Sequence, residues 1–377
     1  MNRILALGLC LLLAACSSND TVELEPAELV KFKETVEVKR LWSQSIGSGA
    51  GSHYTLLPTA IAGDDIFAVD TEGLLMAVNR LNGKKRWRIE LEERVASGVG
   101  AAQGKLFVGT LNGELVALSA SDGSELWRTR LSSEVLAPPQ SNGSVVVVQT
   151  QDGRIVGLDT GSGRQLWMQE VAVPALTLRG TSTPIVTDTA VYAGFASGKI
   201  MALDVKDGLV QWEQRVALAT GRSELERVVD INAAPLLEGD ILYCGSYQGR
   251  LVALNRGTGA GLWAKKESSF NNLAAGNQQI YLTDENAIVK AYNANSGTLV
   301  WENDQLIRRQ VGAPQTFGNY VAVADFEGYV HIMNQSDGTF VARRKVDGDG
   351  VRSPMQGVDN ILYVYGNSGD LVALRAE

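Results

Sequence analysis

The sequence predicts an all-β chain folded as an eight-bladed β-propeller whose blades are four-stranded antiparallel sheets. The first observation is a tryptophan that recurs every 38–51 residues along the 377-residue chain. The second is a glycine that stands four residues before each tryptophan from the second one on. A period near 40 residues marks a supersecondary unit copied many times. The pattern includes all seven tryptophans, which are Trp42, Trp87, Trp127, Trp167, Trp212, Trp263 and Trp301.

The strands of one unit are clearest in residues 144–167. The run 144–150 (SVVVVQT) and the run 154–159 (RIVGLD) are separated by the turn Gln-Asp-Gly, and a second turn leads to Trp167. Short β-branched runs between Gly, Asp and Asn turns are typical of antiparallel strands. Four such strands in about 40 residues predict a propeller blade.

The two ends of the chain predict how the ring closes. Eight outer strands are expected, because Ala342 takes the tryptophan position of one degraded copy. An outer strand at Trp42 has no strands before it, whereas the inner-strand signature at 371–374 (LVAL) has no outer strand after it. We therefore expect residues 38–46 to complete the blade begun by residues 353–374, which removes the open sheet edge.

The recurring tryptophans are interpreted as packing residues. A large flat indole can fill the wedge between adjacent blades, where its N–H needs an acceptor. The glycine before it supplies the tight turn into the outer strand. Ligand binding is the alternative, and it suits poorly a residue that is present in nearly every blade.

Composition and motifs argue against several functions. The net charge of −8 disfavours nucleic acid or an anionic membrane surface as the main partner. The two histidines, His53 and His331, are far apart, and no metal-ligand cluster is visible. There is also no Gly-rich phosphate loop and no nucleophile elbow. We therefore expect no enzymatic activity, no metal and no cofactor.

The N-terminus resembles an export signal. Arg3 precedes an apolar run at 4–13 of signal-peptide length. The sequence Leu-Ala-Ala-Cys that ends at Cys16 resembles the bacterial lipobox, in which that cysteine receives lipid; a plain secretory signal is the alternative. Ser17, by resemblance to bacterial sorting rules, favours the outer membrane. The expected parts are a signal peptide at 1–15, a lipid-anchored tether at 16–37 and the propeller at 38–377.

Two connections between blades break the repeat. From each tryptophan position to the glycine position of the next inner strand the interval is usually 24–27 residues, but it is 31 after Trp42, 31 after Trp167 and 37 after Trp212. The first excess, around residues 47–57, is rich in glycine and serine and is interpreted as a plain flexible loop, so the other two carry the argument. These adjacent connections contain 174–180 (PALTLRG) and 221–232 (GRSELERVVDIN), and both should lie on one face. Apolar residues beside an arginine resemble an interface hot spot. The alternative is that Leu176 and Leu178 are core positions of an extended first strand.

Together, the lipobox, the short tether, the eight blades and the two long connections resemble the BamB family, the lipoprotein subunit of the bacterial β-barrel assembly machinery. The resemblance covers the whole chain. It implies that the two connections contact the periplasmic POTRA domains of BamA. The positions that match family interface residues are Leu176, Leu178, Arg179, Asp230 and Asn232, the last of which is an aspartate in the family pattern.

The expected function is that of a non-enzymatic scaffold, anchored through Cys16 at the periplasmic face of the outer membrane. The resemblance implies binding to BamA and assistance in the folding and insertion of outer-membrane β-barrel proteins, with nascent outer-membrane proteins as further candidate partners. One alternative is a quinone-dependent dehydrogenase on the same fold, which would need a calcium site and a catalytic aspartate that are not recognisable here. The other is a periplasmic binding lipoprotein with a different partner.

Overall fold

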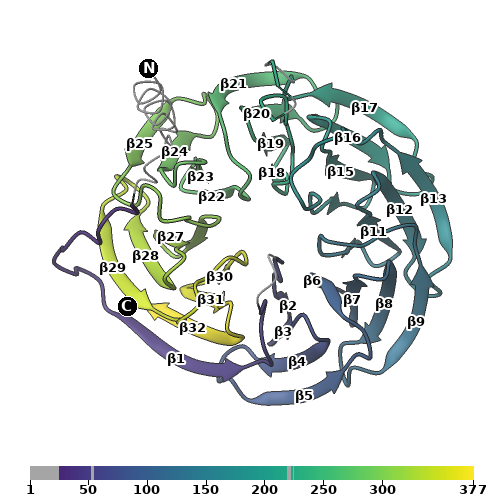
Figure 1. Ribbon diagram of the computed structural model, residues 1–377, viewed down its shortest axis with the longest axis horizontal. Helices are drawn as coiled ribbons and strands as arrows, with labels where there is room; N and C mark the ends of the chain where they lie inside the picture. Colours follow the sequence, from purple (N-terminus) through teal and green to yellow (C-terminus); the bar gives the residue numbers. More distant parts are fainter. Residues whose placement is uncertain (1–24, 52–54, 219–221, 224) are drawn as a thin grey trace, which may run out of the picture.

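The chain forms a ring of eight four-stranded sheets around a central axis (Figure 1), so the predicted eight-bladed β-propeller is confirmed. The computed structural model describes residues 25–51, 55–218, 222–223 and 225–377. Cys16 and His53 lie outside these described residues. Within these residues every regular element is a strand, and there is no helix long and apolar enough to cross a membrane.

The first four blades follow one another along the chain, and each runs from its innermost to its outermost strand. Blade one comprises β2 (Ala60–Ala62), β3 (Asp65–Val69), β4 (Leu74–Asn79) and β5 (Lys85–Glu90). Blade two comprises β6 (Val95–Ala102), β7 (Lys105–Thr110), β8 (Glu114–Ser119) and β9 (Glu125–Arg130). Blade three comprises β10 (Gln140–Ser141), β11 (Val145–Gln149), β12 (Arg154–Asp159) and β13 (Gln165–Glu170). Blade four comprises β14 (Ile185–Val186), β15 (Ala190–Gly194), β16 (Lys199–Asp204) and β17 (Val210–Arg215).

The remaining blades repeat this order until the chain returns to its beginning. Blade five comprises β18 (Leu236–Glu238), β19 (Ile241–Gly245), β20 (Gly249–Asn255) and β21 (Gly261–Glu267). Blade six comprises β22 (Ala274–Gly276), β23 (Gln279–Thr283), β24 (Val289–Asn293) and β25 (Leu299–Asn303). Blade seven comprises β26 (Gln315–Phe317), β27 (Tyr320–Ala324), β28 (Tyr329–Asn334) and β29 (Phe340–Lys345). Blade eight comprises β30 (Gln356–Val358), β31 (Ile361–Tyr365), β32 (Asp370–Ala376) and, from the start of the chain, β1 (Val38–Ser45).

The ring closes in blade eight, as predicted. β1 pairs antiparallel with β32, from Val38 opposite Ala376 to Ser45 opposite Asp370. This pairing joins the first described strand to the last one without a covalent connection. It leaves the propeller with no unpaired inner strand, which is the usual way in which closed β-structures avoid open edges.

The tryptophans lie at the junctions between blades. Each indole N–H donates to a main-chain carbonyl in the turn before the outermost strand of the next blade, which satisfies the polar end of a largely buried ring. The glycine of that same turn lies under the ring: a Cβ on Gly83 would lie 2.7 Å from Trp42 Cγ, and its φ of +72° also favours glycine. The acceptors, at 2.8–3.0 Å, are Arg80 for Trp42, Ala120 for Trp87, Thr160 for Trp127, Val205 for Trp167, Arg256 for Trp212, Ala294 for Trp263 and Gln335 for Trp301.

This geometry explains why Ala342 replaces the tryptophan of blade seven. A tryptophan there would need the turn before the outermost strand of blade eight. That turn does not exist, because β32 ends at Ala376 and the outermost strand is β1 from the other end of the chain. Ala342 is instead fully buried in a cluster with Val38 and Ala376, against which Val36 packs. The substitution is therefore a consequence of the way in which the ring closes.

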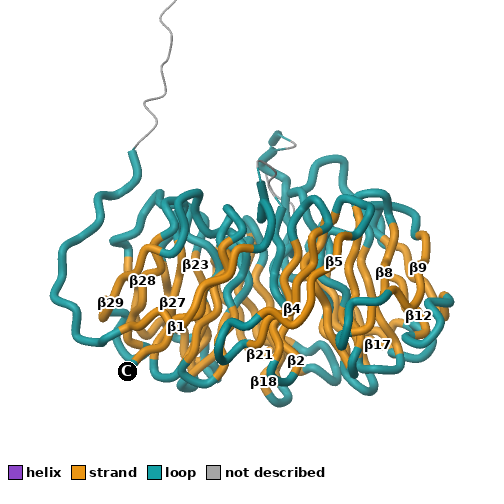
Figure 2. The backbone as a smooth tube through the Cα atoms, turned by 90° about the horizontal axis from the view of Figure 1, so that it is seen from below, coloured by secondary structure: helices purple, strands orange, loops and turns teal. Residues whose placement is uncertain are grey.

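The propeller has two faces that differ in their connections (Figure 2). One face, here called the loop face, carries the connections from the outermost strand of one blade to the innermost strand of the next, together with the turns between second and third strands. The opposite face carries the other turns of each blade. Strand order within every sheet fixes this assignment, because successive antiparallel strands alternate in direction. The two long connections therefore both lie on the loop face.

Candidate partner-binding surface

The two long connections are neighbours on the loop face and contact each other. One joins β13 to β14 and covers residues 171–184; the other joins β17 to β18 and covers residues 216–235. The hydroxyl of Ser182 in the first donates to the carbonyl of Ala233 in the second at 2.9 Å. Gly180, with a φ of +140°, passes close to the side chain of Asn232, which a Cβ on Gly180 would approach to 3.4 Å.

Asp230 links the two connections through hydrogen bonds. Its side chain is 1% exposed, and its Oδ2 accepts a hydrogen bond from the backbone N–H of Leu178 at 3.1 Å. Its carbonyl accepts from the N–H of Tyr247 at 2.8 Å, which links the second connection to blade five. Asp230 thus holds Leu178 in place rather than facing solvent itself.

The electrostatics of Asp230 are unusual. Burial raises the pKa of its carboxyl to about 7, because hydrogen bonds from the backbones of Leu178 and Ile231 compensate the loss of water only in part. Its second oxygen, Oδ1, is buried and has no hydrogen-bond partner among the described residues. The carboxyl therefore changes between its neutral and charged forms near neutral pH.

The first connection exposes several of its side chains to solvent. Leu176 is 49% exposed, and Arg179 is also exposed. Leu178 is half-buried. The first strand of blade four begins only at Ile185, so the alternative that Leu176 and Leu178 belong to an extended first strand is wrong.

The second connection has local order of its own. The Glu226 carboxylate accepts hydrogen bonds from the backbone N–H groups of Ser223 at 3.4 Å and Arg222 at 2.6 Å, while the Ser223 hydroxyl accepts from the N–H of Glu226 at 3.2 Å. This reciprocal arrangement is that of a capping box, which stabilises a single turn. The turn presents Leu225 to solvent with 73% of its surface exposed.

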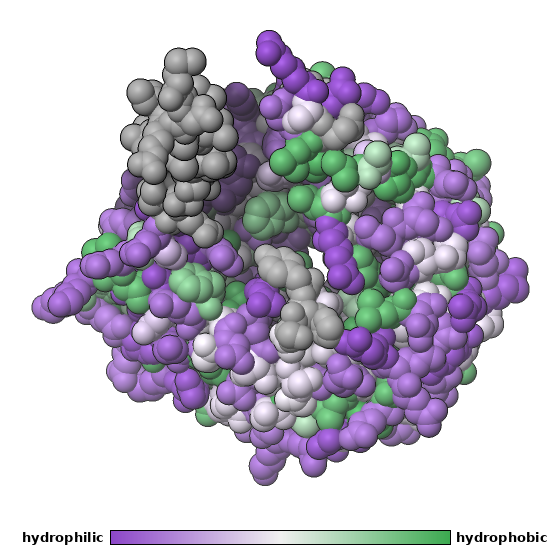
Figure 3. Space-filling view, in the orientation of Figure 1, coloured by the Kyte–Doolittle hydropathy of each residue, from purple (hydrophilic) through white to green (hydrophobic). Residues whose placement is uncertain are grey.

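An apolar hollow lies beside these connections at the mouth of the central channel. It has a volume of about 370 Å³, and Leu178, Arg179 and Asn232 line it. Phe270 and Tyr247, whose rings lie 6.4 Å apart, form another part of its wall. Figure 3 shows this face, with apolar side chains gathered around the central opening. An exposed apolar surface with an arginine at its edge is typical of a protein-binding site.

Arg179 also interacts electrostatically with Glu134, which lies in a third connection between blades. The pKa of Glu134 lies below its usual value because the Ser133 hydroxyl and the Glu134 backbone N–H bind its carboxylate, and because Arg179 adds a favourable charge. Glu134 belongs to the connection between β9 and β10, on the same face. Arg179 thus lies between the apolar hollow and an acidic neighbour.

The structure brings most of the sequence-predicted residues together. Leu178, Arg179 and Asn232 line one hollow, Leu176 lies on the adjoining exposed segment, and Asp230 lies beneath them. Sequence reasoning missed Phe270 and Tyr247. Phe270 lies in the short connection between β21 and β22, so the search for lengthened intervals could not find it.

Two further observations concern reactive groups. Cys244 is fully buried, and burial raises the pKa of its thiol to about 12. In the part of the chain that the structure describes, no group of three or more His, Cys, Asp or Glu side chains is placed to hold a metal ion.

Comparisons with known proteins agree with this picture. The family model described as outer membrane protein assembly factor BamB matches residues 71–289 and 285–377. A protein of that name from Pseudomonas aeruginosa is 55% identical over 367 residues, which cover 97% of each chain. Its namesake from Escherichia coli K12 is 33% identical over 377 residues, which cover 96% of each chain.

Solved structures give the same result. The crystal structure of BamB from Moraxella catarrhalis matches with a TM-score of 0.81 and 30% identity, over 90% of this chain and all of that one. A quinohemoprotein alcohol dehydrogenase from Comamonas testosteroni matches with a TM-score of 0.70 but only 13% identity, over 90% of this chain and 76% of that one, which shows the fold alone.

The fold and the loop face define a class of protein first: a propeller of quinoprotein-like architecture whose most developed surface suits a protein partner. The relatives define the family. The chain belongs to the BamB family of outer membrane protein assembly factors.

Proposed function

We propose that this chain is a lipid-anchored scaffold of outer-membrane protein assembly and that its loop face binds the POTRA domains of BamA. One observation carries the proposal: Asp230 joins the two long connections and holds Leu178 beside an apolar hollow, with Leu176 exposed on the same segment. The relatives, which are named as assembly factors, support the process in which the chain acts.

The chemistry of the surface suits a protein domain with an apolar patch and an acidic rim. Burial of an exposed leucine side chain is worth roughly 1.5–3 kcal/mol, so Leu176 and Leu178 can supply much of the affinity of a modest interface. Arg179 can make paired hydrogen bonds with a carboxylate of the partner and thereby fix its orientation. Asp230 acts indirectly, because it positions the segment that makes these contacts.

The anchor in this proposal is the lipid on Cys16. It rests on the lipobox-like sequence that ends at this residue, since Cys16 lies outside the described residues. A triacylated cysteine supplies more than one acyl chain, which suffices for stable membrane attachment. The proposal places the propeller at the periplasmic face of the outer membrane.

The test is co-purification with BamA. We expect Arg179→Ala, and separately the double variant Leu176→Ala/Leu178→Ala, to weaken association by about tenfold or more, the effect of losing a residue worth at least 1.4 kcal/mol. The matched controls are Arg88→Ala and the double variant Leu126→Ala/Leu262→Ala. These controls remove exposed side chains of the same kinds from the outermost strands of other blades.

The outcomes separate the candidate roles. Unchanged association of both test variants would contradict the proposed interface. Loss of folded protein in the leucine variant, seen as a lowered melting temperature, would instead assign these leucines to the stability of the propeller. Equal weakening by the outer-strand controls would move the binding surface from the loop face to the circumference of the ring.

A further inference from the structure

Residues 25–37, here called the strap, lie against the outer side of blade seven and form no strand of their own (Figures 1 and 2). Near one end, the backbone N–H groups of Thr35 and Val36 donate to the carbonyl of Val341 at 3.0 and 3.4 Å. Near the other, the N–H of Ala27 donates to the carbonyl of Ile307 at 3.1 Å. Main-chain contacts thus fix the strap at both ends.

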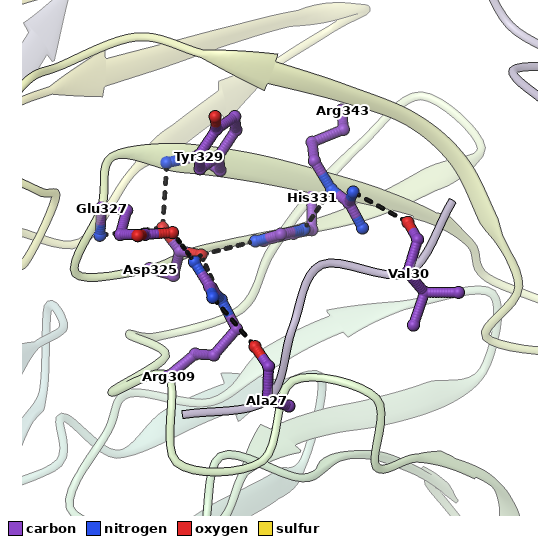
Figure 4. Close-up of polar contacts among 8 residues, drawn as sticks. All are labelled: Ala27, Val30, Arg309, Asp325, Glu327, Tyr329, His331 and Arg343. Atoms are coloured by element: carbon purple, nitrogen blue, oxygen red, sulfur yellow. Dashed lines mark hydrogen bonds and ion pairs between the residues drawn. The ribbon is translucent and has the colours of Figure 1, made fainter. Parts of the chain in front are cut away.

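Two arginines reach outward to the strap between these points (Figure 4): Arg343 of β29 in blade seven, and Arg309 of the connection that leads from β25 into blade seven. Arg343 donates from Nη1 to the carbonyl of Val30 at 3.0 Å. Arg309 donates from Nη1 to the carbonyl of Ala27 at 3.0 Å. Because both acceptors are main-chain carbonyls, these two hydrogen bonds recognise the backbone of the strap rather than its side chains.

A buried polar network holds both arginines from behind (Figure 4). Asp325 and His331 have side chains that are 0% exposed, and that of Arg309 is 4% exposed. Asp325 Oδ2 accepts from Arg309 at 2.7 Å and bonds His331 Nε2 at 3.0 Å. Arg343 Nε donates to His331 Nδ1 at 3.0 Å. Since an arginine nitrogen can only donate, Nδ1 is the acceptor and His331 carries its proton on Nε2, toward Asp325.

This network would be incomplete without the strap. Its two outermost donors, on Arg309 and Arg343, end on strap carbonyls. An unpaired polar group that remains buried is unfavourable, and more so when it is charged. A segment of the same chain therefore pairs two donors of this site, Arg309 Nη1 and Arg343 Nη1, while Arg343 Nη2 is buried without a hydrogen-bond partner among the described residues.

Apolar contacts complete the site. Phe32 of the strap stacks on Phe340 with 5.5 Å between ring centroids, and the Arg343 guanidinium lies 5.0 Å from the centroid of Phe32. Val341 is only 7% exposed, and Val36 of the strap packs against its cluster. The residues at the same position of other outermost strands are far more exposed, at 37–52% for Leu126, Leu166, Leu262 and Val300.

The strap crosses the full height of the ring. It meets β1 at Val38, opposite Ala376 at the end of β32, which is on the face opposite the loop face. At its other end Glu25 and Ala27 contact Arg308 and Ile307, in the connection between β25 and β26 on the loop face. In Figure 2 the described chain accordingly begins at the upper side, where the long connections also project.

We propose that the strap site of blade seven makes the anchored chain leave the propeller from the loop face, so that the candidate partner-binding surface faces the membrane. The inference rests on the proposed lipid anchor at Cys16. Cys16 is nine residues from Glu25 but 22 from Val38. A docked strap limits the distance between lipid and propeller to about 30 Å, whereas a released strap allows about 75 Å from the opposite face.

The test uses the full lipidated chain in phospholipid vesicles that carry an acceptor dye on the headgroups, with no other protein present. One donor dye is placed on Asn112→Cys, on the loop face, and in a second sample on Ser121→Cys, on the opposite face of the same blade. Both positions are exposed, and Cys244 is fully buried. We expect energy transfer to be at least twofold stronger from position 112 than from position 121.

The variant Phe32→Ser/Thr35→Pro changes only the strap, since it removes the aromatic contact and one backbone donor. In this variant we expect the difference between the two labels to disappear and trypsin to cleave after Lys31 and Lys33 faster than in the parent chain. Phe32→Ser alone is the milder form. Glu28→Ser is the control, because Glu28 is an exposed strap residue outside the contacts described above.

The outcomes distinguish the orienting role of the strap from the lipid anchor at Cys16. Equal transfer from both labels in the parent chain, or a difference that persists when the strap variant is cleaved quickly, would overturn the orienting role of the strap. Failure of the parent chain to bind vesicles would instead overturn the lipid anchor of the proposed function. BamA takes no part in this assay, so a failed BamA interface leaves its result unchanged.

Discussion

Two buried aspartates, one at each of the two sites, have opposite electrostatics. Asp230 and Asp325 are 1% and 0% exposed, so burial opposes the charged form of both. Asp230 has only backbone donors, and its pKa is raised to about 7. Burial would likewise raise the pKa of Asp325, but hydrogen bonds from His331, from the backbone of Tyr329 and from Arg309 hold it below its usual value.

The difference shows that the charge partners, rather than the depth of burial, decide the state of a buried carboxyl. Asp325 remains ionised at all ordinary pH values and can organise two arginines that hold the strap. Asp230 is near the midpoint of its titration at neutral pH, and it holds a segment that is exposed to a partner. One site is fixed by its charges, and the other can respond to pH.

We expect the largest effect from removing the charge of Asp325. In Asp325→Asn, Arg309 and His331 lose their carboxylate, and the new amide places donors against donors. Breaking a buried charged network by removal of one partner costs about 3–5 kcal/mol, so we expect the free energy of unfolding to fall by that order. Denaturant unfolding of the full chain measures this change.

Asp65→Asn is the matched control for Asp325→Asn. Asp65 pairs with Arg86 at 2.9 Å on the surface, where its side chain is 30% exposed. Such pairs are worth about 0–1 kcal/mol. If the two variants lose similar stability, Asp325 is not the hub of a buried network, and its contrast with Asp230 fails.

Asp230, unlike Asp325, should make the stability of the folded chain depend on pH between about pH 4 and 7. Because its folded pKa is raised from 3.8 to about 7, the folded chain binds a proton that the unfolded chain releases above pH 4. Stability from this group is therefore complete below about pH 4 and is lost as the pH rises toward 7. Asp230→Asn cannot titrate, so relative to it we expect the parent chain to lose stability over this range, by at most about 1.4 kcal/mol per pKa unit.

Melting temperatures of both proteins at pH 5 and pH 8 test this prediction. His331 contributes the opposite slope, because burial lowers its pKa and the unfolded chain takes up a proton more readily as the pH falls below about 6.5. This slope is common to both proteins and cancels in the difference between them. A difference that does not change with pH would show that Asp230 is ionised throughout, like Asp325.

The sequence predicted the fold in detail because its repeat is periodic. The tryptophans and their glycines occur once per blade, so the number of blades and the closure at Trp42 follow from counting. The pairing of tryptophan and glycine across a junction could not be predicted, because it joins positions in different blades. The reason for Ala342 became visible only once β1 was placed beside β32.

The sequence predicted the residues of the candidate site only where they lengthen the interval between one tryptophan position and the next glycine position. The long connections revealed Leu176–Arg179 and Asp230 by their length, but Phe270 lies in a connection of ordinary length. Residues 25–37 were expected to be part of a tether, because their composition is polar and charged. Arg309 and Arg343 bind main-chain carbonyls of the strap. Because every residue has such a carbonyl, the residue types of the strap could not predict these contacts.

The smallest expected effect concerns the exposed edge of the strap site. Glu34 pairs with Arg344 at 2.6 Å, and this hydrogen bond lowers the pKa of Glu34, but the two side chains are 42% and 29% exposed. Water screens such a pair, so we expect Glu34→Gln to lower stability by less than about 1 kcal/mol. We also expect it to accelerate trypsin cleavage at Lys33 only slightly, and less than Phe32→Ser does. Cleavage as fast as in Phe32→Ser/Thr35→Pro would show that surface charge, rather than the buried arginines and the stacked rings, holds the strap on blade seven.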